Sequence, residues 1–71
     1  MKTIEIKIET NYITLNQFLK LSSIVQTGGH AKVLIQDGEV KVNDNLCLQR
    51  GKKLYKGDIV EILGNKKYEI I

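Results

Sequence analysis

The chain has 71 residues, of which 42% are hydrophobic and 27% are charged, and it contains no proline; this composition predicts a single folded domain over residues 1–71 and excludes a disordered chain. A single cysteine excludes an intramolecular disulfide and a cysteine zinc framework, so a reducing, cytoplasmic setting is expected. The net charge of +3 lies in residues 41–71 and is compatible with a polyanionic partner. No apolar run approaches the roughly 20 residues that cross a bilayer, so no membrane partner is expected.

The first expected element is a strand over residues 2–9, where isoleucine alternates with polar and charged residues. Its buried face would consist of Ile4, Ile6 and Ile8. A helix follows, because Thr14 as N-cap and Gln17 three residues later form a capping box. The helix should end near residues 21–23, and its inner face would consist of Leu15, Phe18 and Leu19.

A second helix is expected to begin at Thr27 as its N-cap and to stop at Gly38. Its inner face would consist of Ala31, Leu34 and Ile35. Gly28 and Gly29 stand at its beginning, although glycine costs roughly 1 kcal/mol against alanine inside a helix. The first N–H groups of a helix attract anions, and a residue without a side chain lets an anion approach the backbone closely. The pair is therefore a candidate phosphate contact, the alternative being a tight turn between two helices.

The second half of the chain is expected to form strands over residues 39–43, 46–48, 59–63 and 66–71, with a polar, basic segment over residues 49–53. A three-residue loop over residues 64–66 would pair Ile62 with Tyr68 and Val60 with Ile70. It would also oppose Glu61 to Glu69, which is unfavourable. The order of elements predicts an α+β fold in which a two-helix pair packs on a small, mostly antiparallel sheet.

Catalysis is not expected, because the residues that could act as nucleophile or base are few. His30 is the only histidine, and its place near a helix start indicates an ordinary surface or capping residue. Cys47 lies in an apolar strand and is expected to be a small core residue. Without an inward pair of carboxylates, the sequence predicts no enzyme, no metal site and no cofactor.

Binding of nucleic acid accounts better for the cations and glycines of the helix pair and the segments after it. The candidate residues are Lys20, Thr27, Gly28, Gly29, Lys32, Lys41, Asn43, Arg50, Lys52 and Lys53. Lysine mainly neutralises phosphate, and arginine adds bidentate geometry. Phe18 and Tyr68 are assigned to the core, which leaves Tyr12 and Tyr55 for stacking, too few for a single-strand platform. The pattern therefore favours recognition of a folded RNA by its backbone and shape.

Three motifs between residues 13 and 62 carry a family resemblance: LNQFLK at 15–20, AKVLIQDGEVKVN at 31–43, and GDIV at 57–60. On these motifs the chain resembles the RNA-binding domain named after the fourth protein of the small ribosomal subunit, here called the S-four domain. It is most similar to the small stand-alone, YaaA-type bacterial form. The resemblance implies contact with ribosomal or transfer RNA by Lys20, Lys32, Lys41 and Asn43, flanked by residues 50–53.

Length and composition indicate a monomer, and a role in ribosome assembly is expected, with ribosomal or assembly proteins as further partners. The family usually has Ser-Arg at the start of the second helix, where this chain has Thr27 and Gly28. Lys32 and the glycine backbone are expected to replace the missing arginine. A protein-docking module with a β-grasp fold is the alternative. It would lack carrier chemistry, because the chain ends in Glu69-Ile70-Ile71 instead of a Gly-Gly terminus.

Overall fold

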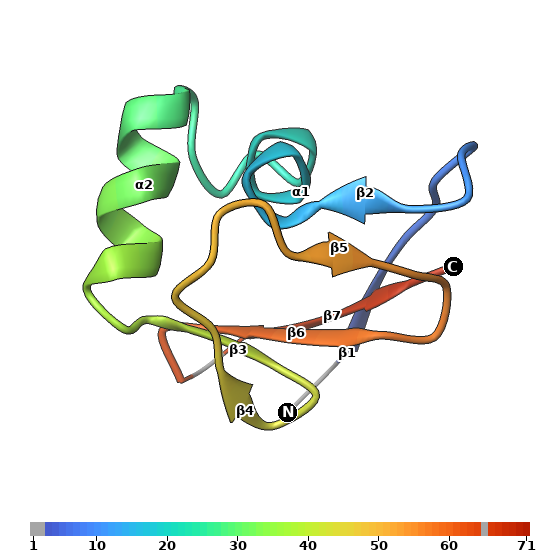
Figure 1. The fold of residues 1–71 in the computed structure, drawn as a ribbon. Coiled ribbons are helices and arrows are strands. Elements are labelled where there is room, and N and C mark those ends of the chain that lie inside the picture. The colour runs from blue at the N-terminus through green and yellow to red at the C-terminus, as the bar shows by residue number, and fades with distance from the viewer. Residues whose placement is uncertain (1–2, 65) are drawn as a thin grey trace.

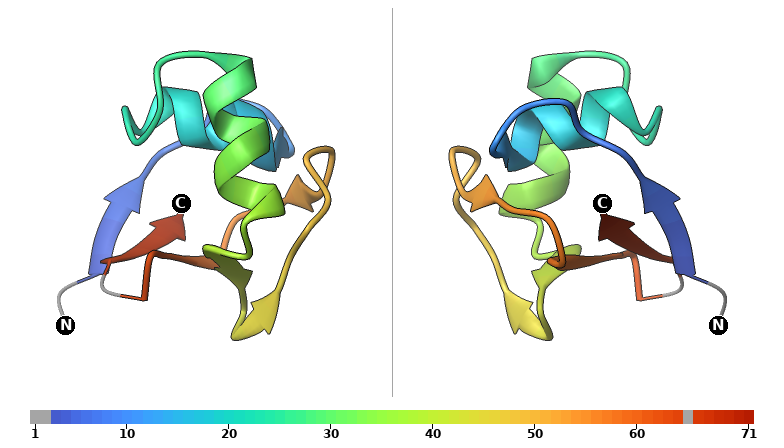
Figure 2. Two further views of the ribbon diagram at one scale, coloured as in Figure 1. Left: turned by 90° about the vertical axis from the view of Figure 1, so that its left-hand side faces the viewer. Right: turned by 90° about the vertical axis from the view of Figure 1, so that its right-hand side faces the viewer.

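The fold consists of a helix layer on one face of a sheet (Figure 1). Helices α1 (Leu15–Leu21) and α2 (Gly28–Gln36) lie side by side in that layer. The five-stranded sheet has the spatial order β1 (Thr3–Ile6), β7 (Lys66–Ile70), β6 (Ile59–Ile62), β3 (Val40–Val42) and β4 (Asn45–Leu46). The short strands β2 (Ile13–Thr14) and β5 (Lys53–Leu54) form a separate pair. Figure 2 shows from two sides that the helices cover the same face of the sheet.

The structure, a computed structural model, describes residues 3–64 and 66–71. Lys2, at the predicted start of the first strand, and Asn65, in the predicted last turn, lie outside these residues. Strands β1 and β7 run parallel, and the other neighbouring strands of the described sheets run antiparallel. This arrangement confirms the predicted α+β fold, a two-helix pair on a small, mostly antiparallel sheet.

Both predicted ends of α2 are confirmed by their hydrogen bonds. The Thr27 side chain accepts a hydrogen bond from the N–H of His30 at 3.1 Å, which satisfies one of the free donors at the helix start. Gly38 has φ +77°, a left-handed conformation that glycine adopts without steric cost. Its N–H donates to the carbonyl of Ile35 at 3.1 Å and so closes the last turn.

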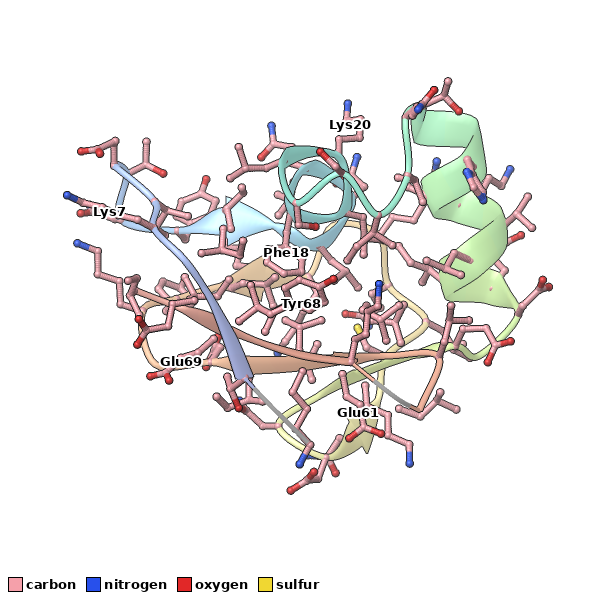
Figure 3. All side chains as sticks on the ribbon, turned by 180° about the vertical axis from the view of Figure 1, so that it is seen from behind. Lys7, Phe18, Lys20, Glu61, Tyr68 and Glu69 are labelled. Atoms are coloured by element: carbon pink, nitrogen blue, oxygen red, sulfur yellow. The ribbon has the colours of Figure 1, made fainter. Side chains whose placement is uncertain are left out.

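The core lies between the helices and the sheet, where Phe18 meets Tyr68 edge to face with ring centroids 5.7 Å apart (Figure 3). Both residues are buried, as is Cys47, and all three core assignments are confirmed. The predicted inner face of the first strand is only partly buried, because β1 is an edge strand: Ile8 is covered, whereas Ile4 remains 44% exposed. The largest fully buried side chains are Phe18, Leu15, Leu19, Ile35, Leu54, Ile62, Ile70, Val40 and Val60.

The predicted register of the last hairpin is wrong, because each residue of β6 lies opposite a residue two positions earlier in β7 than expected. Val60 lies opposite Tyr68, and Ile62 lies opposite Lys66. The turn begins at Leu63 instead of Gly64, because Leu63 already has left-handed backbone with φ 55°. A displacement by two residues keeps every side chain on its predicted face, so the core is unaffected. It also removes the expected opposition of two glutamates, since Glu61 now faces Lys67.

The strands on either side of the basic segment also differ from prediction. Strand β4 covers Asn45–Leu46 instead of residues 46–48, and Leu48 lies outside it with 55% of its surface exposed. The pairing of β2 with β5 was not predicted, because two-residue strands contain no detectable hydrophobic period. This small sheet determines where the basic segment lies.

Candidate nucleic-acid interface

The first group of candidate residues lies at the end of the helix layer farthest from the sheet. Lys20 is exposed in the last turn of α1 (Figure 3), and α2 begins at this same end of the molecule (Figure 1). Val25 anchors the connection between the helices to the core, because its side chain is only 2% exposed. Its N–H also donates to the carbonyl of Leu19 at 3.2 Å. Packing of this connection therefore determines how the two helix ends lie side by side.

The glycine pair forms an open backbone edge at the start of α2. A Cβ added to Gly28 would meet no atom within 4 Å, and one added to Gly29 would meet only the Thr27 hydroxyl, at 4.0 Å. The left-handed residue between the helices is Ser23, with φ 62°, so the tight turn does not depend on the glycine pair. Neither packing nor backbone conformation thus explains why glycine stands at these two positions. The remaining physical explanation is that a ligand approaches the backbone closely there.

Lys32 lies on α2, one turn beyond the glycine pair, and its side chain is exposed. It follows Ala31, which is fully buried on the inner face of the helix. Lys32 therefore stands outside the core on the same helix as the open backbone edge.

The basic segment is attached to the beginning of α1. The N–H of Leu15 donates to the carbonyl of Lys52 at 2.8 Å, and the N–H of Asn16 donates to the carbonyl of Arg50 at 3.1 Å. These two bonds satisfy helix donors that have no partner within α1. Lys53 is fixed next to them, because it pairs with Thr14 across the two-stranded sheet. The side chains of Arg50, Lys52 and Lys53 are all exposed.

Lys20 and the basic segment therefore lie at opposite ends of one short helix. Seven helical residues span roughly 10 Å, which brings both ends within reach of a single RNA. We use the name helix-side surface for the set Lys20, Thr27, Gly28, Gly29, Lys32, Arg50, Lys52 and Lys53.

Lys41 does not belong to this surface. Val40 and Val42 on either side of it are buried against the helix layer, so Lys41 points from the opposite face of the sheet. There it lies across from Glu61 of β6, which in turn lies across from Lys67 of β7. Cross-strand neighbours of opposite charge stabilise a sheet, so the place of Lys41 in this row is explained by the stability of the sheet.

Asn43 is occupied by hydrogen bonds within the protein. Its amide oxygen accepts from the N–H of Ile59 at 2.9 Å, and its amide nitrogen donates to a carboxylate oxygen of Asp58 at 3.1 Å. Its backbone N–H also donates to the carbonyl of Ile59 at 2.7 Å. The side chain therefore joins the turn after β3 to the start of β6.

The charges of the chain are segregated between the two faces. Residues 10–36 and 45–57, which include both helices and the two-stranded sheet, contain no Asp or Glu. Their cations are Lys20, Lys32, Arg50, Lys52, Lys53 and Lys56. The uncovered face of the five-stranded sheet carries Glu5, Glu61 and Glu69 with Lys41 and Lys67. In Figure 3, Glu61 and Glu69 lie far from Lys20. The helix layer therefore carries an excess of positive charge, whereas the open sheet carries charges of both signs.

The residues that could take part in catalysis are dispersed. His30 is exposed and its backbone N–H completes the cap of α2, whereas Cys47 is 9% exposed and belongs to the core. Within residues 3–64 and 66–71, no three His, Cys, Asp or Glu side chains gather as a metal site would require. In the same residues, neither helix has the length and apolar character needed to cross a membrane.

Comparison with known proteins gives a consistent result. Residues 6–71 match the S4 domain family. Over 66 residues the chain is 48% identical to the "Probable ribosome maturation protein RlbA" of Bacillus subtilis (strain 168), and the match covers 93% of each protein. Among solved structures, the chain is similar to the 30S ribosomal protein S4e from Thermoplasma acidophilum, with a TM-score of 0.64 and 23% identity. That match covers 86% of this chain and 32% of the ribosomal protein, and it shows a shared fold.

Proposed function

The chain belongs to the S4 domain family, and on this premise we propose that it is a non-catalytic RNA-binding protein that acts in ribosome maturation. The name of the Bacillus subtilis relative supports this role, because that protein matches nearly the whole chain at 48% identity. The family match also favours the S-four resemblance over the β-grasp alternative. We expect the protein to act as a monomer in the cytoplasm, where ribosomes mature.

The proposed contact is made mainly with the phosphates of a structured RNA. The observation that carries this proposal is the absence of carboxylates from residues 10–36 and 45–57, which hold every cation of the helix-side surface. Lysine and arginine in such a region bind phosphate without reading sequence, and the affinity falls as salt rises. The open backbone at Gly28 and Gly29 adds N–H donors beside Lys32. Lys41 and Asn43 act within the protein fold in this proposal.

Ribosomal RNA is the proposed partner, with transfer RNA as the competing substrate. The experiment uses labelled transcripts of 16S and 23S rRNA domains and an unmodified tRNA, each titrated at about 50 and 200 mM salt. Wild type is compared with Lys20→Ala/Lys32→Ala on the helix side and Lys41→Ala/Lys67→Ala on the open sheet. The two double variants have the same net charge, so any difference between them reflects position.

We expect the helix-side variant to bind rRNA more weakly and the sheet variant to bind almost as wild type does. The slope of log affinity against log salt should decrease by about 0.7 to 0.9 for each phosphate contact removed. Equal affinities of the two double variants would contradict the proposed surface. Tighter binding of tRNA than of every rRNA transcript would contradict the choice of ribosomal RNA.

A further inference from the structure

Two exposed tyrosines meet at the end of the two-stranded sheet. Tyr12 precedes β2 and Tyr55 follows β5, and the pairing of Ile13 with Leu54 brings them together across the strands. Their ring centroids are 6.0 Å apart and the ring planes are inclined by 48°. Because Leu54 is fully buried, its neighbours in the strand point the other way, and the two rings remain 41% and 49% exposed.

The backbone under each ring is held by its own hydrogen bonds. The Thr10 hydroxyl donates to the carbonyl of Tyr12 at 2.7 Å. The N–H of Tyr55 donates to a carboxylate oxygen of Asp58 at 2.8 Å, and the N–H of Asp58 donates back to the carbonyl of Tyr55 at 3.0 Å. Gly57 supplies the left-handed residue of this turn, with φ +99°. The backbone that carries the two rings is therefore held by the protein itself.

A cation lies against one ring of this pair. The Lys53 ammonium lies 5.0 Å from the centroid of the Tyr12 ring, and Lys52 and Lys56 are its neighbours in the chain. Asp58, the carboxylate nearest to Tyr55 in the sequence, is engaged by the Tyr55 N–H and by the Asn43 amide. An aromatic surface bordered by ammonium groups suits a nucleobase joined to phosphates, because every base has a face that stacks on an aromatic ring.

We propose that Tyr12 and Tyr55 form a stacking site for one unpaired base of the RNA held on the helix-side surface. This inference rests on the proposed function and extends it from phosphate contact to recognition of a bulged or flipped nucleotide. The rings are inclined to each other, so a base parallel to one ring meets the other at an angle, and the site accepts a single base. In this proposal Lys53 neutralises a phosphate beside that base, because its ammonium lies against the Tyr12 ring.

The test uses a labelled hairpin RNA with one unpaired adenosine and the same hairpin without it. We expect wild type to bind the bulged hairpin about 5- to 150-fold more tightly than the hairpin without the bulge. This range corresponds to the free energy of stacking one base on an aromatic ring. Tyr12→Leu/Tyr55→Leu should bind both hairpins with equal affinity, because it lacks both rings. Tyr12→Phe/Tyr55→Phe is the matched control, and it should retain the preference because both rings remain.

A second measurement places the fluorescent base 2-aminopurine at the bulge. Its emission should be quenched by wild type and by the phenylalanine variant, but not by the leucine variant. The single variants Tyr12→Leu and Tyr55→Leu extend the test if circular dichroism shows that the double variant does not fold. Equal binding of both hairpins by wild type, or a preference that survives in a folded leucine variant, overturns the stacking site but not RNA binding. If wild type binds the rRNA transcripts but neither hairpin, the stacking site alone is overturned, whereas failure to bind the transcripts as well overturns the proposed function.

Discussion

Asn43 shows how one side chain can join two parts of the sheet. It has φ 51°, a left-handed conformation that asparagine tolerates better than most residues. In this conformation its amide reaches Asp58 and the backbone of Ile59, both about fifteen residues away in the chain. Asp58 also binds the N–H of Tyr55, so the same network supports the turn under the proposed stacking site.

At the residue scale, we predict that Asn43→Ala lowers the free energy of unfolding by about 1 to 3 kcal/mol. The variant loses two side-chain hydrogen bonds and puts alanine at a positive φ, a conformation that asparagine tolerates better because its polar side chain can bond locally. Urea denaturation measures the loss. Asn43→Gly is the control for the backbone, because it removes the same hydrogen bonds but tolerates the conformation, and it should fall between alanine and wild type. Weaker RNA binding by a fully folded Asn43→Gly protein would contradict the structural role.

At the element scale, helix α2 begins with residues that weaken it. Thr27 caps its beginning and Gly38 ends it, but Gly28 and Gly29 have low helix propensity. There is open space beside both glycines. A segment that sacrifices local stability without a packing reason is typical of a functional site. The adjacent α1 has its first N–H groups bonded to the basic segment, so the two helix starts meet different partners.

We predict that Gly28→Ala/Gly29→Ala stabilises the protein by up to about 1 kcal/mol for each substitution. There is open space at both positions, so no repacking cost is expected. The same variant should bind structured RNA more weakly, because the methyl groups keep phosphate away from the backbone. Thermal unfolding and an RNA titration measure the two effects.

Gln36→Ala provides the comparison, since it raises helix propensity at the exposed last residue of α2 and leaves the first turn intact. It should stabilise the protein slightly and leave RNA binding unchanged. If both variants bound RNA as wild type does, the glycine pair would have no part in binding.

At the scale of the whole molecule, two layers are joined by a small core. The molecule measures 26 × 25 × 19 Å, and Phe18 and Tyr68 provide an aromatic contact between its layers. A domain of this size has little stability in reserve. The charge segregation depends on this contact, because it keeps the helix layer on one face of the sheet.

We predict that Phe18→Ala costs about 3 to 5 kcal/mol of stability, enough to unfold a large fraction of the protein. The reason is the cavity left between α1 and the sheet, where Phe18 is fully buried. Circular dichroism with urea denaturation measures the loss. Leu21→Ala removes a large side chain from the same helix where it is 55% exposed, and it should change stability by less than about 0.5 kcal/mol. Similar losses in both variants would argue against a core centred on Phe18.

The sequence by itself determined the features that depend on neighbours a few residues apart. The caps at Thr14 and Thr27, the stop at Gly38 and the inward faces of the strands all follow from side-chain chemistry and periodicity over one or two turns. Much of the core followed from the same periods, but Leu54 is fully buried in a two-residue strand that no period indicated, and Ile4 is 44% exposed.

The tertiary structure alone decided which of these local features meet. It separated Lys41 from the helix-side cations, because a strand side chain faces whichever side its buried neighbours leave open. It brought Tyr12 beside Tyr55 through a two-residue strand pair. Pairings of this kind join residues some forty positions apart, and their energy comes from contacts that exist only once the chain has closed on itself.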